Sequence, residues 1–221
     1  MNVLILSDLH ANYAAIKPLK VAAAEADLVL CLGDLVGYYC QVNEVLDFVR
    51  GVNAISVRGN HDEYLLSGYP PKAPEAVRFG IEYADHIIQA DHRRWLAALP
   101  LVWGGALDQS SVLISHGSPF RPLTDYLYPN KIADFPLDQF DFDTLAFGQT
   151  HVPYVDSSRR PLLLNPGSVG QSRISPGIAC AARLATNTNT VELLRYPYDT
   201  QEVINLAVKN GAQGWVRKHM I

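Results

Sequence analysis

The chain has little of several features that mark particular protein classes. It has only three cysteines in 221 residues, too few and too scattered for a disulfide framework. Charged residues make up only 18% and the formal net charge is −4, which argues against broad binding to nucleic acid, because that needs a basic face. No apolar run approaches the roughly 20 residues that span a bilayer, and the N-terminus lacks the basic start of a signal peptide. These absences predict a soluble cytoplasmic protein with no membrane partner.

Internal repeats and low-complexity linkers are also missing. Apolar residues make up 48% of the chain, enough to fill one well-buried core at this length. We therefore expect a single domain over residues 1–221.

The arrangement of apolar runs predicts an α/β fold. Residues 3–6, 28–32 and 54–57 have the pattern of strands, and residues 13–26 and 43–50 between them have the pattern of helices. Pro18 should begin or kink the first helix. A β-α-β-α-β order implies parallel strands joined by right-handed crossovers.

The second half of the chain is richer in strands. Two further helices are expected at residues 75–88 and 91–99, after a Gly- and Pro-rich loop at residues 66–74. Strand patterns then follow at residues 112–115, 145–147, 162–164, 178–184 and 191–195. A last helix at residues 200–209 begins with a capping sequence at Asp199. The whole reads as a two-layer sheet core flanked by helices.

Short polar clusters close five of the apolar runs. They are Asp8-Leu9-His10, Gly33-Asp34, Gly59-Asn60-His61-Asp62, His116-Gly117 and Gly148-Gln149-Thr150-His151. Open α/β sheets build their sites where strands end, and a core has no need of costly buried polar groups there. The series therefore predicts a metal centre.

The residue types narrow the chemistry of that centre. Carboxylates at Asp8 and Asp34 combined with imidazoles at His10, His116 and His151 suit Mn, Fe, Zn or Ni better than Ca. Asn60 would add a neutral amide oxygen to a site already rich in negative charge, and His61 would stand beside the metals as a catalytic acid. Two ions about 3.5–4 Å apart would polarise a phosphoryl group and activate a bridging hydroxide.

The five clusters, in this order and with these gaps, resemble the calcineurin-like metallophosphoesterases, and most closely their small single-domain bacterial and archaeal branch. The resemblance runs from Met1 to about Gly170 and includes Asn165-Pro166-Gly167-Ser168. It implies a four-layer α/β/β/α sandwich with a dinuclear metal centre at the carboxyl ends of the strands.

The resemblance also assigns roles by motif. The first metal would be held by Asp8, His10, Asp34 and His151. The second would be held by Asp34 (shared), Asn60 and His116, with His61 as the acid or as the group that stabilises developing charge.

Two positions depart from the family pattern. The last motif usually reads Gly-His-x-His, and Gln149 stands where that histidine would bind the second metal. Because an amide oxygen is a weaker donor than imidazole, we expect the second site to bind more weakly or to prefer Mn or Fe over Zn; equal, tight occupancy of both sites would contradict this. Gly37 stands where some relatives carry an Asp that orients the catalytic histidine, which leaves open whether Asp62 supports His61.

Other polar residues have weaker assignments. Arg58 precedes the Gly59 cluster, as in the protein-phosphatase members, and is expected to contact phosphate; a surface ion pair is the alternative. The turn at residues 165–170 is expected to support the site structurally. The remaining histidines, His86, His92 and His219, are expected to be solvated or satisfied in the core.

Three functions remain open on the sequence. The first is a metal-dependent phosphodiesterase acting on a phosphorylated small molecule. The second is a serine/threonine protein phosphatase acting on a phosphoprotein, or another phosphomonoesterase, which Arg58 favours. The third is a catalytically weak scaffold of the same fold, which only Gln149 favours.

Overall fold

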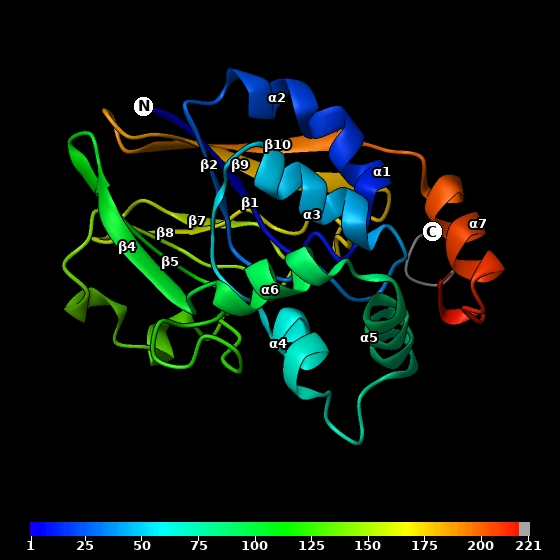
Figure 1. Cartoon of the computed structure of the whole chain (residues 1–221). Helices are drawn as coiled ribbons and strands as arrows, with labels where there is room; N and C mark the ends of the chain where they lie inside the picture. The colour runs from blue at the N-terminus through cyan, green and yellow to red at the C-terminus, as the bar shows by residue number, and fades with distance from the viewer. Residues whose placement is uncertain (217–221) are drawn as a thin grey trace.

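Two five-stranded sheets packed face to face form the centre of the computed structural model, which describes residues 1–216 (Figure 1). The strand orders are β10-β9-β1-β2-β3 and β4-β5-β6-β8-β7. His219 lies outside the described residues.

The first sheet contains the parallel strands expected from the N-terminal half. Its strands are β1 (Asn2–Leu6), β2 (Leu28–Cys31), β3 (Ile55–Ser56), β9 (Ile178–Ala185) and β10 (Thr190–Pro197). β1, β2 and β3 run parallel, and β9 pairs antiparallel with both β1 and β10. The crossovers therefore place the residues that follow β1, β2 and β3 at one edge of the sheet.

Helices cover the outer face of this sheet. They are α1 (Tyr13–Ile16), η1 (Lys17–Leu19), α2 (Lys20–Glu25) and α3 (Val42–Gly51), grouped on one side in Figure 1. The helix expected at residues 13–26 is broken by a 3₁₀ turn at Pro18, whose ring and missing N–H oppose a continuous helix. Along β1, Leu4 and Leu6 face these helices, while Val3 and Ile5 face the second sheet.

The second sheet combines parallel and antiparallel pairs. Its strands are β4 (Val102–Leu107), β5 (Ser110–Ser115), β6 (Thr144–Ala146), β7 (Tyr154–Asp156) and β8 (Leu162–Asn165). β5, β6 and β8 are parallel, whereas β4 and β7 form the edges as antiparallel partners. The outer face is covered by an irregular segment with two short 3₁₀ helices, η2 (Ile132–Asp134) and η3 (Leu137–Gln139). This completes the expected α/β/β/α layering, with a thin fourth layer.

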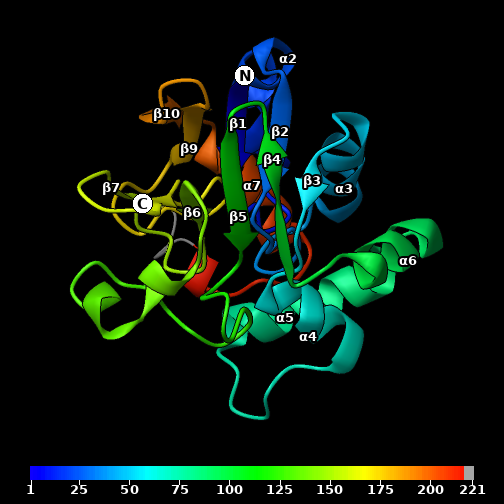
Figure 2. The same ribbon diagram turned by 90° about the vertical axis from the view of Figure 1, so that its left-hand side faces the viewer.

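Three more helices follow β3 and precede β4 in the chain. They are α4 (Asn60–Ser67), α5 (Glu75–Ile87) and α6 (Ala90–Ala98), and they gather beyond one end of the strands in Figure 2. α4 was not anticipated, because its first residues are the polar cluster itself. α7 (Thr200–Lys209) matches the expected last helix, and the Asp199 side chain accepts hydrogen bonds from the backbone N–H groups of Gln201 and Glu202.

Among residues 1–216, none of the helices combines the length and apolar character that crossing a membrane would require.

Candidate metal centre

The strand ends deliver the polar clusters to one place. Asp8 and His10 follow β1, and Asp34 follows β2. Asn60 and His61 begin α4 directly after β3, His116 follows β5, and His151 follows β6. Because β1, β2 and β3 are parallel to one another, as are β5 and β6, their carboxyl ends meet at one edge of the sandwich. All seven side chains are buried, with no more than 5% exposed.

Three of these residues converge at one end of the cluster, which we call the His10 end: Asp8, His10 and His151. His10 Nε2 lies 3.1 Å from His151 Nε2, and His151 Nε2 lies 3.2 Å from Asp8 Oδ1. The Asp34 carboxylate is beside them, with Oδ2 at 3.7 Å from His10 Nε2. This end is therefore rich in carboxylate and imidazole donors.

Asn60, His116 and Gln149 form the opposite end, which we call the His116 end. His116 Nε2 lies 3.1 Å from Asn60 Oδ1 and 3.4 Å from Asp34 Oδ2. Gln149 Nε2 approaches Asn60 Oδ1 at 3.5 Å, and Gln149 Oε1 is buried without a hydrogen-bond partner among the described residues. Asp34 thus stands between the two ends, where a shared ligand would be needed.

Backbone carbonyls fix the orientation of the three imidazoles. Nδ1 of His10, His116 and His151 lies 3.2, 2.7 and 2.7 Å from the carbonyl oxygens of Val36, Leu32 and Gln171 respectively. A carbonyl only accepts, so each Nδ1 donates its proton, and each Nε2 that carries no proton of its own turns a lone pair toward the cluster. Converging lone pairs repel one another unless a cation lies between them.

A second observation also points to a cation. Asp8 Oδ1 is buried and has no hydrogen-bond partner within residues 1–216. An unpaired buried carboxylate oxygen is costly, and a divalent ion would satisfy it. The donor set of two carboxylates, three imidazoles and an amide fits divalent transition metals of the Mn, Fe, Zn or Ni type.

The charges of the cluster are strongly coupled. Burial on its own would raise the pKa of Asp34, but the neighbouring His116 and His61 lower it well below its ordinary value. Burial on its own would lower the pKa of His116, but the Asp34 carboxylate outweighs it and raises that pKa to about 9. Burial, reinforced by His61, holds the pKa of His10 well below 6.5. The two ends therefore differ in how readily they hold a proton.

His61 faces the same cluster from the start of α4. Its ring centroid lies 4.8 Å from those of both His10 and Tyr38, and its Nε2 is 4.0 Å from Asp34 Oδ2. Its Nδ1 is buried without a partner in the described part of the chain. A methyl group at Gly37, where φ is 92°, would collide with that Nδ1. Gly37 therefore leaves room for His61 where some relatives place a carboxylate.

Asp62 does not support His61; it ties two loops together. One of its oxygens accepts the N–H groups of Leu35 and Val36, and the other accepts those of Asp34 and Gly59, at 2.9–3.2 Å. Four backbone donors on one carboxylate fix the loop after β2 against the first turn of α4. The sequence had left this role open.

Other predicted residues are engaged elsewhere. Arg58 Nε lies 3.2 Å from Glu63 Oε2, so its guanidinium forms the ion pair that was the alternative to phosphate contact. Ser168 Oγ donates to the Asp8 carbonyl oxygen at 2.8 Å and accepts from Gln171 N at 2.7 Å, a structural role for the turn at residues 165–170. His92 is buried, with Nε2 3.1 Å from Asp47 Oδ1, and His86 is exposed.

The loops around the centre adopt unusual backbone conformations that sequence reasoning missed. Ten non-glycine residues of the described chain have positive φ. Seven of them lie in these loops: Asp8, His10, Ala11, Asp34, Tyr38, Gln149 and His151. L-residues rarely adopt this region, and each instance costs of order 1–3 kcal/mol.

Comparisons with known proteins agree with this geometry. The sequence model of the calcineurin-like phosphoesterase superfamily domain matches residues 1–189. A metallophosphoesterase structure from Sphaerobacter thermophilus is 28% identical, with a TM-score of 0.84 over 100% of this chain and 98% of that one. An uncharacterized protein of Methanocaldococcus jannaschii is 28% identical over 99% of this chain and 96% of its own length. The structure of an archaeal phosphodiesterase shares the fold at 16% identity and a TM-score of 0.54, over 89% and 100% of the two chains.

Proposed function

Because the chain belongs to the calcineurin-like phosphoesterase superfamily, we propose that it is a metal-dependent hydrolase of phosphate esters, with phosphodiesters as its preferred substrates. The observation that carries the proposal is the gathering of three imidazole Nε2 atoms and two carboxylates in one buried cluster, with Asp8 Oδ1 left without a hydrogen-bond partner among the described residues. Such a cluster would stabilise bound cations, whereas an apolar core gains nothing from it.

Each residue of the cluster has a proposed part. Asp8, His10, Asp34 and His151 would hold one divalent ion, and Asp34, Asn60 and His116 a second, with Gln149 as a weak additional donor. Ions bound there would polarise the phosphoryl oxygens and activate water for in-line attack. The carbonyl partners of the three imidazoles hold the rings with Nε2 toward the cluster, where it would bind an ion.

His61 is the proposed catalytic residue. Burial lowers the pKa of His61, so the neutral ring with one N–H is favoured near pH 7. From its position beside Asp34 it would protonate the leaving oxygen or donate a hydrogen bond to the charge that develops there. The rings of Tyr38 and His10 pack against the His61 ring and limit its rotation.

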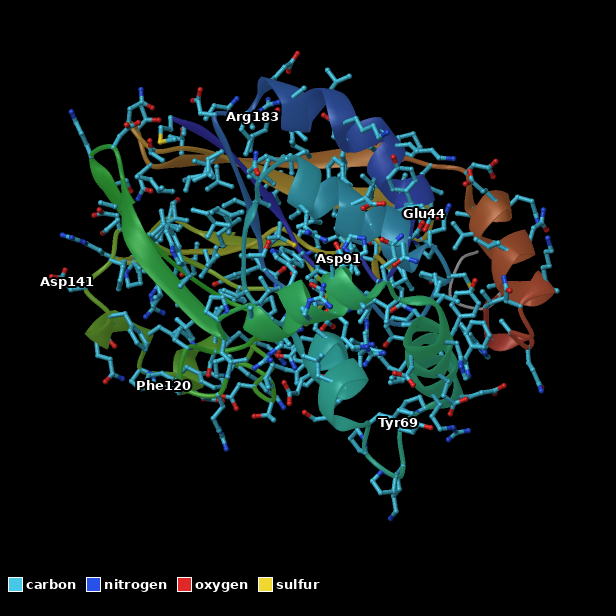
Figure 3. All side chains as sticks on the ribbon, in the orientation of Figure 1. Glu44, Tyr69, Asp91, Phe120, Asp141 and Arg183 are labelled. Atoms are coloured by element: carbon cyan, nitrogen blue, oxygen red, sulfur yellow. The ribbon has the colours of Figure 1, made fainter. Side chains whose placement is uncertain are left out.

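Two observations favour a diester over a phosphoprotein. A cavity of about 410 Å³ lies beside the centre, within the range of small-molecule pockets. Arg58, which favoured the protein-phosphatase alternative, is held by Glu63. The loops that carry Tyr69 and Phe120 also lie on the α4 side of the molecule, at its outer edge, where they could contact a substrate (Figure 3).

The test is hydrolysis of bis-p-nitrophenyl phosphate beside p-nitrophenyl phosphate. Metal-stripped protein is resupplied with Mn, Ni, Zn or Mg, and His61→Ala is compared with His86→Ala, which removes an exposed histidine of α5. We expect metal-dependent turnover, faster on the diester, that falls about 10²–10⁴-fold in His61→Ala only.

Other outcomes have clear meanings. A preference for p-nitrophenyl phosphate would favour the phosphomonoesterase alternative. Folded, metal-loaded protein that hydrolyses neither ester would contradict the proposal and favour the scaffold alternative, for which Gln149 is the supporting residue.

A further inference from the structure

A cavity of about 410 Å³ opens beside the metal centre. It is lined by Tyr38, Pro74, Ala76, Gln171, Ser172, Arg173 and Pro176. These residues come from the loop after β2, the start of α5 and the loop between β8 and β9. Three separate segments therefore meet around one hollow.

Two of the lining residues connect the cavity to the centre. The Tyr38 ring packs edge-on against His10, with centroids 4.5 Å apart, and lies 4.8 Å from the His61 ring. The Gln171 carbonyl oxygen accepts the Nδ1 proton of His151 at 2.7 Å. A group bound in the cavity would thus lie next to a phosphoryl group held at the centre.

The position of Tyr38 is itself built into the fold. Tyr38 has a φ of 57°, and α5 packs against its backbone at Gly80, where an added methyl group would collide with the Tyr38 backbone nitrogen. This close approach holds the Tyr38 side chain in place between the cavity and the metal centre, where it forms a wall that we call the Tyr38 wall. The cavity is a consequence of how α5 packs on the loop after β2.

Arg173 gives the cavity its charge. None of the seven lining residues is acidic, and Arg173 forms no ion pair within residues 1–216. An exposed arginine at a hollow that has no carboxylate in its lining to neutralise it is suited to bind an anion from outside the protein.

We propose that this cavity binds the part of the substrate beyond the scissile phosphoryl group, and that Arg173 selects substrates carrying a second anionic group there, a carboxylate or a further phosphate. The inference rests on the proposed function, because it takes the centre as the place of the scissile group. It adds a specificity residue, Arg173, and a substrate class, compact phosphate esters with two anionic groups.

Binding tests the inference without turnover. Isothermal titration of Mn-loaded protein compares 3-phosphonopropionate with propylphosphonate, which carries a methyl group in place of the carboxylate. We expect the ligand with the second anionic group to bind about tenfold more tightly, a difference of about 1.4 kcal/mol, and Arg173→Gln to remove that difference. Arg159→Gln is the matched control, because Arg159 lies before β8, at the opposite ends of the strands, and should leave the ratio unchanged.

Turnover gives the second readout. Three 4-nitrophenyl diesters share one scissile bond and leaving group and differ in the other arm: propyl, 3-carboxypropyl or 3-phosphonopropyl. We expect kcat/KM to be about tenfold higher for the two esters with anionic arms than for the propyl ester. The Arg173→Gln variant should lose this preference and should hydrolyse the propyl ester as fast as the unchanged protein does. The ratio between the carboxylate and phosphonate arms identifies the anion preferred.

The two proposals fail in different ways. Equal binding of both phosphonates, or a preference that survives Arg173→Gln, overturns this inference even if the esters are hydrolysed through His61. Hydrolysis of none of the esters, with the binding preference intact and dependent on Arg173, overturns the proposed function and supports the anion site.

Discussion

The two ends of the buried cluster are built from different donors. At the His10 end, two imidazoles and the Asp8 carboxylate lie within 3.8 Å of one another. At the His116 end, one imidazole meets the amide of Asn60, with the amide of Gln149 behind it. Imidazole and carboxylate hold transition metals more strongly than amides do. The comparison teaches that, in the proposed centre, the His10 end would hold an ion more strongly than the His116 end, although Asp34 lies next to both.

Removing the shared carboxylate should have the largest effect. Asp34 lies within 3.7 Å of both His10 and His116, so Asp34→Asn should weaken both positions and lower kcat/KM by about a thousandfold or more. Metal content after dialysis and turnover of the diester measure this. Asp141→Asn is the control, since its side chain is 98% exposed at the far edge of the molecule (Figure 3). A variant that lost metal from one end only would show that Asp34 is not shared.

Separate variants at the two ends should have unequal effects. His151→Ala removes an imidazole, and we expect about a hundredfold weaker binding of the more tightly held ion. Gln149→Ala removes a weak donor, and we expect a change of about threefold at most, at the other position. Competition titration with a fluorescent chelator measures both. Equal losses would remove the distinction between the ends.

The pH dependence should also distinguish them. In the metal-free protein, burial lowers the pKa of His116, but the nearby Asp34 carboxylate outweighs burial and raises this pKa to about 9. Below that pH, His116 Nε2 carries a proton that a metal ion would have to displace. Affinity at the His116 end should therefore rise about tenfold per pH unit up to about pH 9 and then level off. His10, with its pKa held well below 6.5, carries no such proton near neutrality.

Titration with Mn at pH 6.5, 7.5 and 8.5 measures that slope. The weaker of the two binding steps should gain affinity with pH, and His116→Asn should remove the gain. A slope that survives the substitution would assign the competing proton to another group.

Making the two ends alike should strengthen binding at the His116 end. Gln149→His would place an imidazole beside Asn60, and histidine tolerates the positive φ of 65° at this position better than most residues. We expect the weaker position to tighten by about tenfold, and calorimetry to show two steps drawing together. Gln139→His, which adds the same side chain on an exposed turn, should change neither step.

Much of the architecture could be predicted because it follows from apolar periodicity. The strands β1 and β2 are almost continuous apolar runs, and the hairpin of β9 and β10 was predicted from two strand-like segments joined by a polar turn. The edge strand β4 was missed, because Gly104 and Gly105 dilute its apolar pattern and it is held by pairing with β5. The layered sheets are confirmed by the structure.

The sequence predicts which residues form the site, but only partly which residues hold them in position. The metal-ligand candidates come from five short motifs, and the structure brings all of them together, although their binding roles stay predictions. The four N–H bonds to Asp62 and the Tyr38 wall depend on loop conformation, which local sequence does not specify. Arg173 was missed because a single exposed arginine carries no signal until a cavity forms around it.

The left-handed backbone around the centre limits how this site can be transplanted. Seven loop residues carry their side chains on positive-φ positions, and idealised scaffolds exclude such positions for non-glycine residues. A design that copied only the ligand identities onto regular strand ends would direct Asp8, Asp34 and His151 along different vectors. To transfer the site to another protein, a design would therefore have to copy the strained turns together with the buried core that stabilises them.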